Sequence, residues 1–118
     1  MDITAMADEV GTRRLGIAGR ITQNDLGEQW AALDRMMNPG ESPRPLLLDL
    51  GAADFIDSSG LSWLLMWHKR YACAGTKLVL HSISPMVFDV LRMMRLDSVF
   101  NVAADENAAR AMLEGAAG

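Results

Sequence analysis

The sequence predicts an α/β domain with a small, mostly parallel β-sheet and packed helices. Two short apolar runs, residues 46–50 (LLLDL) and 77–81 (KLVLH), are typical of strands that are buried on both faces. Helix-like segments lie before, between and after these runs, and strands that alternate with helices build a parallel sheet. The chain has 118 residues, of which half are hydrophobic, so it fits one domain with one core.

The first part of the chain predicts two elements. Residues 1–13 show no periodicity and are expected to form a flexible N-terminus. Residues 14–21 (RLGIAGRI) predict a short or irregular strand. A helix is expected next, because apolar residues recur on one helical face until Asn38-Pro39-Gly40 ends it. These apolar residues are Leu26, Trp30, Leu33 and Met37.

Two further helices are expected on either side of the second buried strand. One begins at Asp57 or Ser58 and runs to about Cys73, since Asp and Ser are favoured helix caps and Gly75 lies just beyond the expected end. The other begins at Ser84-Pro85, because proline is favoured at the first helical position. Its core stripe is expected to be Val87, Leu91 and Met94.

A short strand at 99–102 and a helix over 105–113, capped by Asp105, are expected to complete the domain. The domain is therefore expected to span residues 14–113, followed by a C-terminal tail at 114–118.

Charge and cysteine content exclude several classes of protein. The 11 basic and 15 acidic residues give a net charge of -4, and no basic block is present to bind nucleic acid. One cysteine allows no intrachain disulfide and no cysteine-built metal site. The N-terminus lacks the apolar core of a signal peptide, and no apolar run approaches the length of a membrane span. A cytoplasmic protein without membrane insertion is expected.

The usual signals of an enzyme are weak. No glycine-rich phosphate-binding motif and no G-x-S-x-G nucleophile motif occurs. His68 and His81 stand apart without a metal-ligand pattern, and Cys73 is expected to be a small buried side chain. Asp54 and Asp57 could form a pair of carboxylates, but capping and turn formation are commoner uses in such a loop. No catalytic residue, metal or cofactor is therefore expected.

The segment from Phe55 to Leu61 links a buried strand to a helix N-terminus and carries two hydroxyls, those of Ser58 and Ser59. Two interpretations remain open from the residues alone. The first is ordinary capping. The second is phosphorylation, because a phosphate at a helix N-terminus gains roughly 0.3–2 kcal/mol from the helix dipole and free N–H donors.

Asp57-Ser58-Ser59-Gly60-Leu61, following Leu46-Leu47-Leu48-Asp49-Leu50, resembles the STAS domain family, in particular the bacterial anti-sigma factor antagonists. Lys77-Leu78-Val79-Leu80 after Gly75, and Ile83-Ser84-Pro85-Met86-Val87 after that, agree with this resemblance. The resemblance covers about residues 14–113. Gly19-Arg20-Ile21-Thr22 departs from it, because the family usually has acidic residues at that turn.

The resemblance implies a regulatory switch that is not an enzyme and needs no cofactor. It implies that an anti-sigma kinase phosphorylates Ser58, that a phosphatase removes the phosphate, and that the unphosphorylated form binds the kinase and frees the sigma factor. Asp57, Ser59 and Gly60 are then expected to shape the loop. The alternative is a constitutive STAS subunit of a lipid-transport ATPase or of a stressosome-type assembly.

A helical projection of residues 61–72 separates two faces. Leu61, Leu64, Leu65, His68 and Ala72 share the face that is expected to meet the sheet. On the other face lie Trp63, Met66, Trp67 and Arg70. The second set is expected to bind a partner protein or a second copy of the chain, unless loops or the N-terminal segment cover it.

Overall fold

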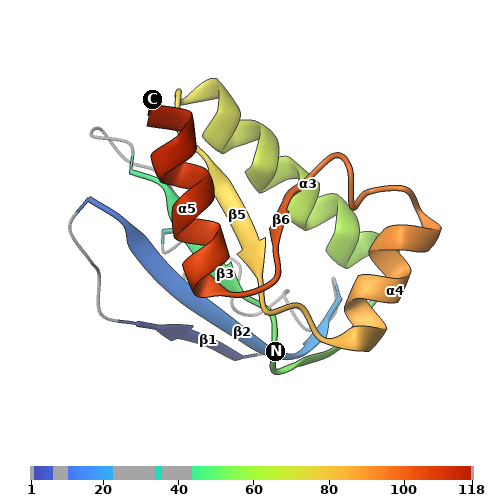
Figure 1. Cartoon of the computed structure of the whole chain (residues 1–118). Coiled ribbons are helices and arrows are strands. Elements are labelled where there is room, and N and C mark those ends of the chain that lie inside the picture. The colour runs from blue at the N-terminus through green and yellow to red at the C-terminus, as the bar shows by residue number, and fades with distance from the viewer. Residues whose placement is uncertain (1, 7–10, 23–33, 36–43, 118) are drawn as a thin grey trace.

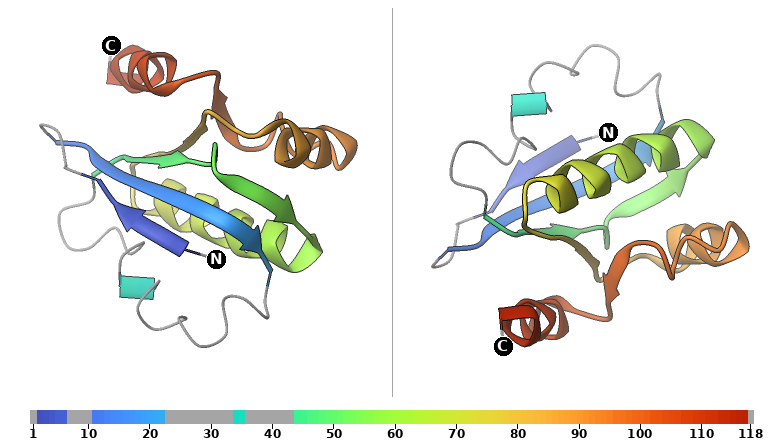
Figure 2. Two further views of the ribbon diagram at one scale, coloured as in Figure 1. Left: turned by 90° about the horizontal axis from the view of Figure 1, so that it is seen from below. Right: turned by 90° about the horizontal axis from the view of Figure 1, so that it is seen from above.

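The computed structural model describes residues 2–6, 11–22, 34–35 and 44–117, and these build one sheet with helices on both faces (Figures 1 and 2). The strands are β1 (Asp2–Ala5), β2 (Arg13–Ile21), β3 (Leu46–Asp49), β4 (Ala53–Ile56), β5 (Leu78–His81) and β6 (Asn101–Ala103). The helices are α3 (Ser58–Cys73), α4 (Pro85–Met93) and α5 (Glu106–Ala117). The expected α/β class is confirmed.

The sheet has the strand order β1-β2-β3-β5-β6, and β4 pairs with β2. The pairing of β1 with β2 is antiparallel, whereas the other described strand pairs are parallel, so the sheet is mixed. Strand β2 pairs with β3 along its first half and with β4 along its second half. The pairing of β2 with β4 shifts its register between Gly19 and Arg20, and the positive φ of Gly19, 83°, suits glycine. This arrangement brings the end of β4, and therefore the start of α3, next to Ile21.

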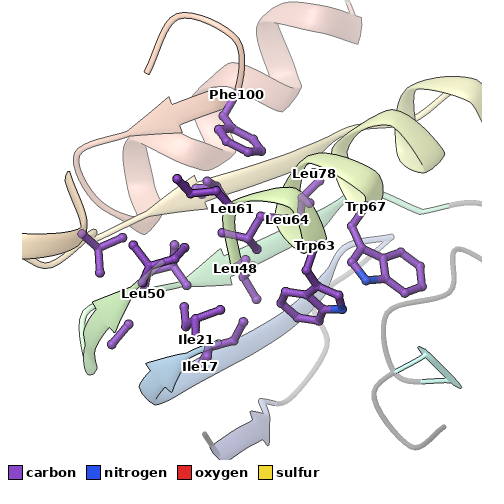
Figure 3. Packing of buried hydrophobic residues seen from close by; sticks show 14 of the residues in the cluster. Ile17, Ile21, Leu48, Leu50, Leu61, Trp63, Leu64, Trp67, Leu78 and Phe100 are labelled. Carbon is purple, nitrogen blue, oxygen red and sulfur yellow. The ribbon is translucent and has the colours of Figure 1, made fainter. Parts of the chain in front are cut away.

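Alternate residues of the central strands face two different cores. Leu46, Leu48, Leu78 and Leu80 point toward α3 and pack in the larger core, part of which Figure 3 shows. Leu47 and Val79 point the other way and pack with Ala109 of α5. A strand covered on both faces has no polar side to alternate with, which explains the continuous apolar runs in β3 and β5.

Both ends of the chain differ from the expectation. Residues 2–5, expected within a flexible N-terminus, form β1 and pair with β2. The last helix continues to Ala117 and so includes most of the expected tail. Strand β4 was not expected, because the four residues ADFI are too few to stand out from the loop around them. The helix expected around Leu26 to Met37 lies outside the described residues, apart from Asp34 and Arg35, which are helical.

The assignment of faces on α3 was wrong. Trp63 and Trp67 are only 4% and 1% exposed and lie in the core with Leu64, as Figure 3 shows. The buried stripe also includes Tyr71, whereas Ala72, assigned to the sheet, is exposed. The buried stripe of α3 contains aromatic residues and a glycine as well as leucines. Its centre therefore lies at Leu64 and Trp67, whereas the expected stripe was centred between Leu61 and Leu65.

Candidate functional site

Helix α3 begins at Ser58, and Asp57 is its N-cap. Asp57 is extended, with φ −112° and ψ −175°, and its Oδ1 accepts a hydrogen bond of 3.0 Å from the backbone N–H of Gly60. This bond satisfies one of the N–H groups that have no partner within the first turn of a helix. Of the two expected caps, the structure therefore selects Asp57, and Ser58 occupies the first helical position.

The two serines of the site have different environments. Ser59 donates its hydroxyl hydrogen to Oδ1 of Asp57, at 2.5 Å. Ser58 is exposed, and its hydroxyl makes no hydrogen bond within the described part of the chain. Ser59 therefore supports the loop, whereas Ser58 is exposed on the surface at the start of α3.

Gly60 lies against the end of β2. A Cβ atom at Gly60 would stand 2.0 Å from the carbonyl oxygen of Ile21 and 2.9 Å from Cγ1 of Ile56. Only glycine can occupy this position without moving the helix or the strand. The sequence pattern marked Gly60 as a loop residue but could not reveal this contact, because Ile21 is distant in the sequence.

The electrostatic surroundings of Ser58 are set by Asp57. The hydrogen bond from Ser59, followed by that from the Gly60 N–H, lowers the pKa of the Asp57 carboxyl group. Asp57 is therefore charged at neutral pH. Arg20 at the end of β2 stacks on Phe55 of β4, with its guanidinium carbon 4.4 Å from the ring centroid. Arg20 therefore places a positive charge at the end of β2, on the strand that pairs with β4 before the loop.

Of the four α3 residues that were expected to bind a partner, Arg70 alone is exposed. Trp63 and Trp67 are buried, Met66 is half-buried, and Arg70 is exposed. Arg70 lies over the ring of Trp67 at 4.8 Å and forms an ion pair with Asp34 at 3.3 Å. Arg70 therefore covers part of the aromatic surface, and the two tryptophans stabilise the core.

Exposed large apolar side chains occur instead on α4 and the loop that follows it. Met86, Met93, Met94 and Val99 are between 46% and 81% exposed. Val87 and Leu91 form the buried stripe of α4 as expected, but Met94 does not belong to it. Ser84, at the N-cap position of α4, makes no capping hydrogen bond with its side chain. Its hydroxyl donates to the Ala53 carbonyl at 2.6 Å and so ties α4 to β4.

The two histidines and the cysteine lie outside the Ser58 loop. His81 is buried, its Nδ1 lies 2.9 Å from Oγ of Ser82, and burial lowers its pKa. His68 packs edge-on against Phe100. Cys73 is exposed, in contrast to the expectation. Among the described residues, His, Cys, Asp and Glu side chains form no cluster that could hold a metal ion, and none of the helices could span a bilayer.

Comparison with known proteins agrees with this architecture. A family model described as "Mlab, STAS domain" matches residues 5–103. BtrV of Bordetella bronchiseptica, assigned as an anti-sigma factor antagonist, is 35% identical over 86 residues, which are 73% of this chain and 72% of that protein.

Two solved structures share the fold. An anti-sigma-factor antagonist (STAS) domain protein from Planctomyces limnophilus has a TM-score of 0.79 at 22% identity, covering 97% of this chain and 99% of the other. The anti-sigma factor antagonist SpoIIAA, in its unphosphorylated form, has a TM-score of 0.71 at 17% identity, covering 94% and 96%. With the family model matching most of the chain, the protein belongs to the STAS domain family.

Proposed function

We propose that the protein is an anti-sigma factor antagonist controlled by phosphorylation of Ser58. In this proposal the unphosphorylated protein binds an anti-sigma factor that is also a serine kinase, and the kinase transfers a phosphoryl group from its own ATP to the Ser58 hydroxyl. A phosphatase restores the binding form. The name of BtrV supports the general role of antagonist.

The observation that carries the proposal is the difference between the two adjacent serines. The Ser59 hydroxyl is bonded to Asp57, whereas Ser58 is exposed at the first position of α3. A kinase must bring the acceptor oxygen in line with the phosphate of ATP, so the acceptor has to be accessible. Ser58 meets this requirement without breaking a bond that holds the loop.

A phosphate on Ser58 is expected to weaken binding of the partner while leaving the fold nearly unchanged. A phosphoserine adds about −1.5 to −2 charges at neutral pH. At Ser58 this charge would stand at the positive end of the α3 dipole, which stabilises it, and next to the Asp57 carboxylate, which opposes it. These two contributions partly cancel within the protein. A partner that packs on the same helix end would meet a dense negative charge and lose the contact.

The apolar side chains on α4 support a protein as the binding partner. Exposed apolar patches on soluble proteins commonly mark protein interfaces, and methionine adapts to varied partner surfaces. Because Ser84 ties the start of α4 to β4, and β4 leads into Asp57, Met86 in the first turn of α4 belongs to the same part of the molecule as Ser58.

The test is capture of the natural partner from a native lysate with tagged variants, followed by mass spectrometry. Ser58→Asp should lower the recovered partner at least about tenfold, which corresponds to ~1.4 kcal/mol of binding free energy. Asn107→Asp is the matched control, because it adds one negative charge to an exposed position in the first turn of α5, on the other face of the sheet. Equal recovery with both variants would reject the switch and favour the constitutive assembly subunit.

A further inference from the structure

Strand β1 is at one edge of the sheet. It pairs with β2 on its inner side, and within residues 2–6, 11–22, 34–35 and 44–117 no strand pairs with its outer side (Figures 1 and 2). An edge strand presents unpaired N–H and C=O groups that can pair with another chain. Its side chains are largely accessible, since Asp2, Thr4 and Ala5 are exposed.

The hydrogen-bond pattern shows which residues of β1 face outward. The N–H of Met6 donates to the carbonyl of Arg14 at 3.0 Å, so Met6 faces β2. In an antiparallel pair the bonding direction alternates, so Thr4 and Asp2 also face β2, opposite Gly16 and Ala18. The backbone N–H and C=O groups of Ile3 and Ala5 therefore point toward the outer edge.

The pattern within β2 agrees with this assignment. The N–H of Arg13 donates to the carbonyl of Pro45 at 2.9 Å, which places Arg13 on the side of β3. Arg14, the next residue, must then face β1, as its bond to Met6 requires.

Natural edges are protected by short length, Lys, Pro, bulges, inward-pointing charges or a covering helix or loop. Strand β1 is short, at four residues, but it lacks several of the other protections. Residues 2–6 contain no Lys and no Pro, the described pairing with β2 is regular, and the only charge is that of Asp2 at the first position.

We infer that β1 is the pairing surface for a second copy of this chain, whose β1 runs antiparallel to it across a two-fold axis at Thr4. In this register Ile3 lies opposite the second copy's Ala5, and Ala5 lies opposite the second copy's Ile3. Each of these two pairs exchanges two backbone hydrogen bonds. In this two-fold register both outward-facing residues of β1, Ile3 and Ala5, form backbone hydrogen bonds with the second copy.

The side chains suit this register. Thr4 lies opposite its own copy, and threonine pairs across strands are favourable. Asp2 lies opposite the second copy's Met6, so no like charges meet. Thr4 and Met6 also line a hollow of about 330 Å³ above Gly16 and Ala18, which leaves room for the side chains of the second copy on that face. The pairing would extend the sheet through both molecules.

Disulfide trapping tests the register directly. In a Cys73→Ser background, Thr4→Cys should give a disulfide-linked dimer under mild oxidation, because non-hydrogen-bonded pairs place Cα atoms about 4.5 Å apart. Asp2→Cys is the matched control. Its two copies would be four residues out of register, about 13 Å apart along the strands, and should give at least about fivefold less dimer.

A second variant tests the backbone bonds. Ala5→Pro removes one outward-facing N–H and no bond to β2, so it should leave the circular dichroism spectrum unchanged and abolish trapping through Cys at position 4. Equal dimer from the Thr4→Cys and Asp2→Cys proteins would overturn the inference, as would trapping that persists in Ala5→Pro. Neither result depends on a kinase, so the outcome is separate from the test of the proposed function.

Discussion

The Asp57 carboxylate accepts both the Ser59 hydroxyl, at 2.5 Å, and the Gly60 N–H, at 3.0 Å, through the same oxygen. This relationship gives the adjacent serines separate roles. Ser59 and Asp57 hold the start of α3 in place, and Ser58 carries no structural hydrogen bond within the described residues. Phosphorylation can therefore change the surface at Ser58 without removing the cap.

Asp57 should contribute to stability as a cap. Asp57→Ala should lower the free energy of unfolding by roughly 0.5–2 kcal/mol, and Asp57→Asn should lower it less, because the amide oxygen can still accept the hydrogen bonds. Chemical denaturation near pH 7 measures both. If both substitutions left the free energy of unfolding nearly unchanged, Asp57 would not stabilise the protein as a cap.

The cap should also respond to acid. The native pKa of Asp57 lies below its ordinary value of 3.8, so the stability that its charge provides is present above that pH. It should be lost as the pH falls below about 3.8 through the lowered native pKa. Asp57→Asn, which has no proton to gain, should lose less stability than the wild type over the same range.

Gly60 should not tolerate a side chain. Gly60→Ala places a Cβ atom into the Ile21 carbonyl, so we expect it to lower the free energy of unfolding by about 3 kcal/mol or more. Ser62→Ala, an exposed position two residues further along α3, is the control and should change stability by less than about 0.5 kcal/mol. A Gly60→Ala protein as stable as the control would show that the approach of α3 to β2 is not tight.

Trp67 should be required for folding. Trp67→Ser removes a side chain that is 1% exposed, and truncations of this size cost about 3–5 kcal/mol. Met66→Ser, on the half-buried neighbour, should cost clearly less. Thermal unfolding followed by circular dichroism compares the two. If Trp67→Ser melts no lower than Met66→Ser, the ring is not part of the core.

Tyr71 should ionise late. Burial raises the pKa of Tyr71 to about 12, against the lowering influence of Arg13 and Arg44. Because the native pKa is above the ordinary value of 10.0, stability should be full below pH 10 and should fall between pH 10 and 12. The chain has one tyrosine, so the absorbance change of tyrosinate reports Tyr71 alone. A midpoint near 10 in the folded protein would show an accessible phenol.

The sequence predicted those elements whose signal is local. The buried strands β3 and β5 follow from continuous apolar runs, and α3 follows from a cap at Asp57 and a glycine beyond Cys73. Asp105, expected to cap the last helix, accepts the N–H of Ala108 at 2.8 Å. The loop at Ser58 was identified because Asp, Ser and Gly are concentrated where a strand meets a helix.

Features that depend on distant residues could not be predicted in the same way. Strand β4 exists because the second half of β2 is available to pair with it, and a four-residue segment does not show this. The orientation of α3 depends on which side chains fill the space above the sheet, so the aromatic residues were assigned to the wrong face. The contact between Gly60 and Ile21 likewise depends on the pairing of β2 with β4.

The most direct test of the proposed switch is the site of phosphorylation. The wild type, Ser58→Ala and Ser59→Ala proteins are incubated with the captured kinase and ATP, and the intact mass of each is followed in time. We predict that the wild type and Ser59→Ala gain one phosphate and that Ser58→Ala gains none. Labelling of Ser58→Ala to the same extent as the wild type would contradict the assignment of Ser58.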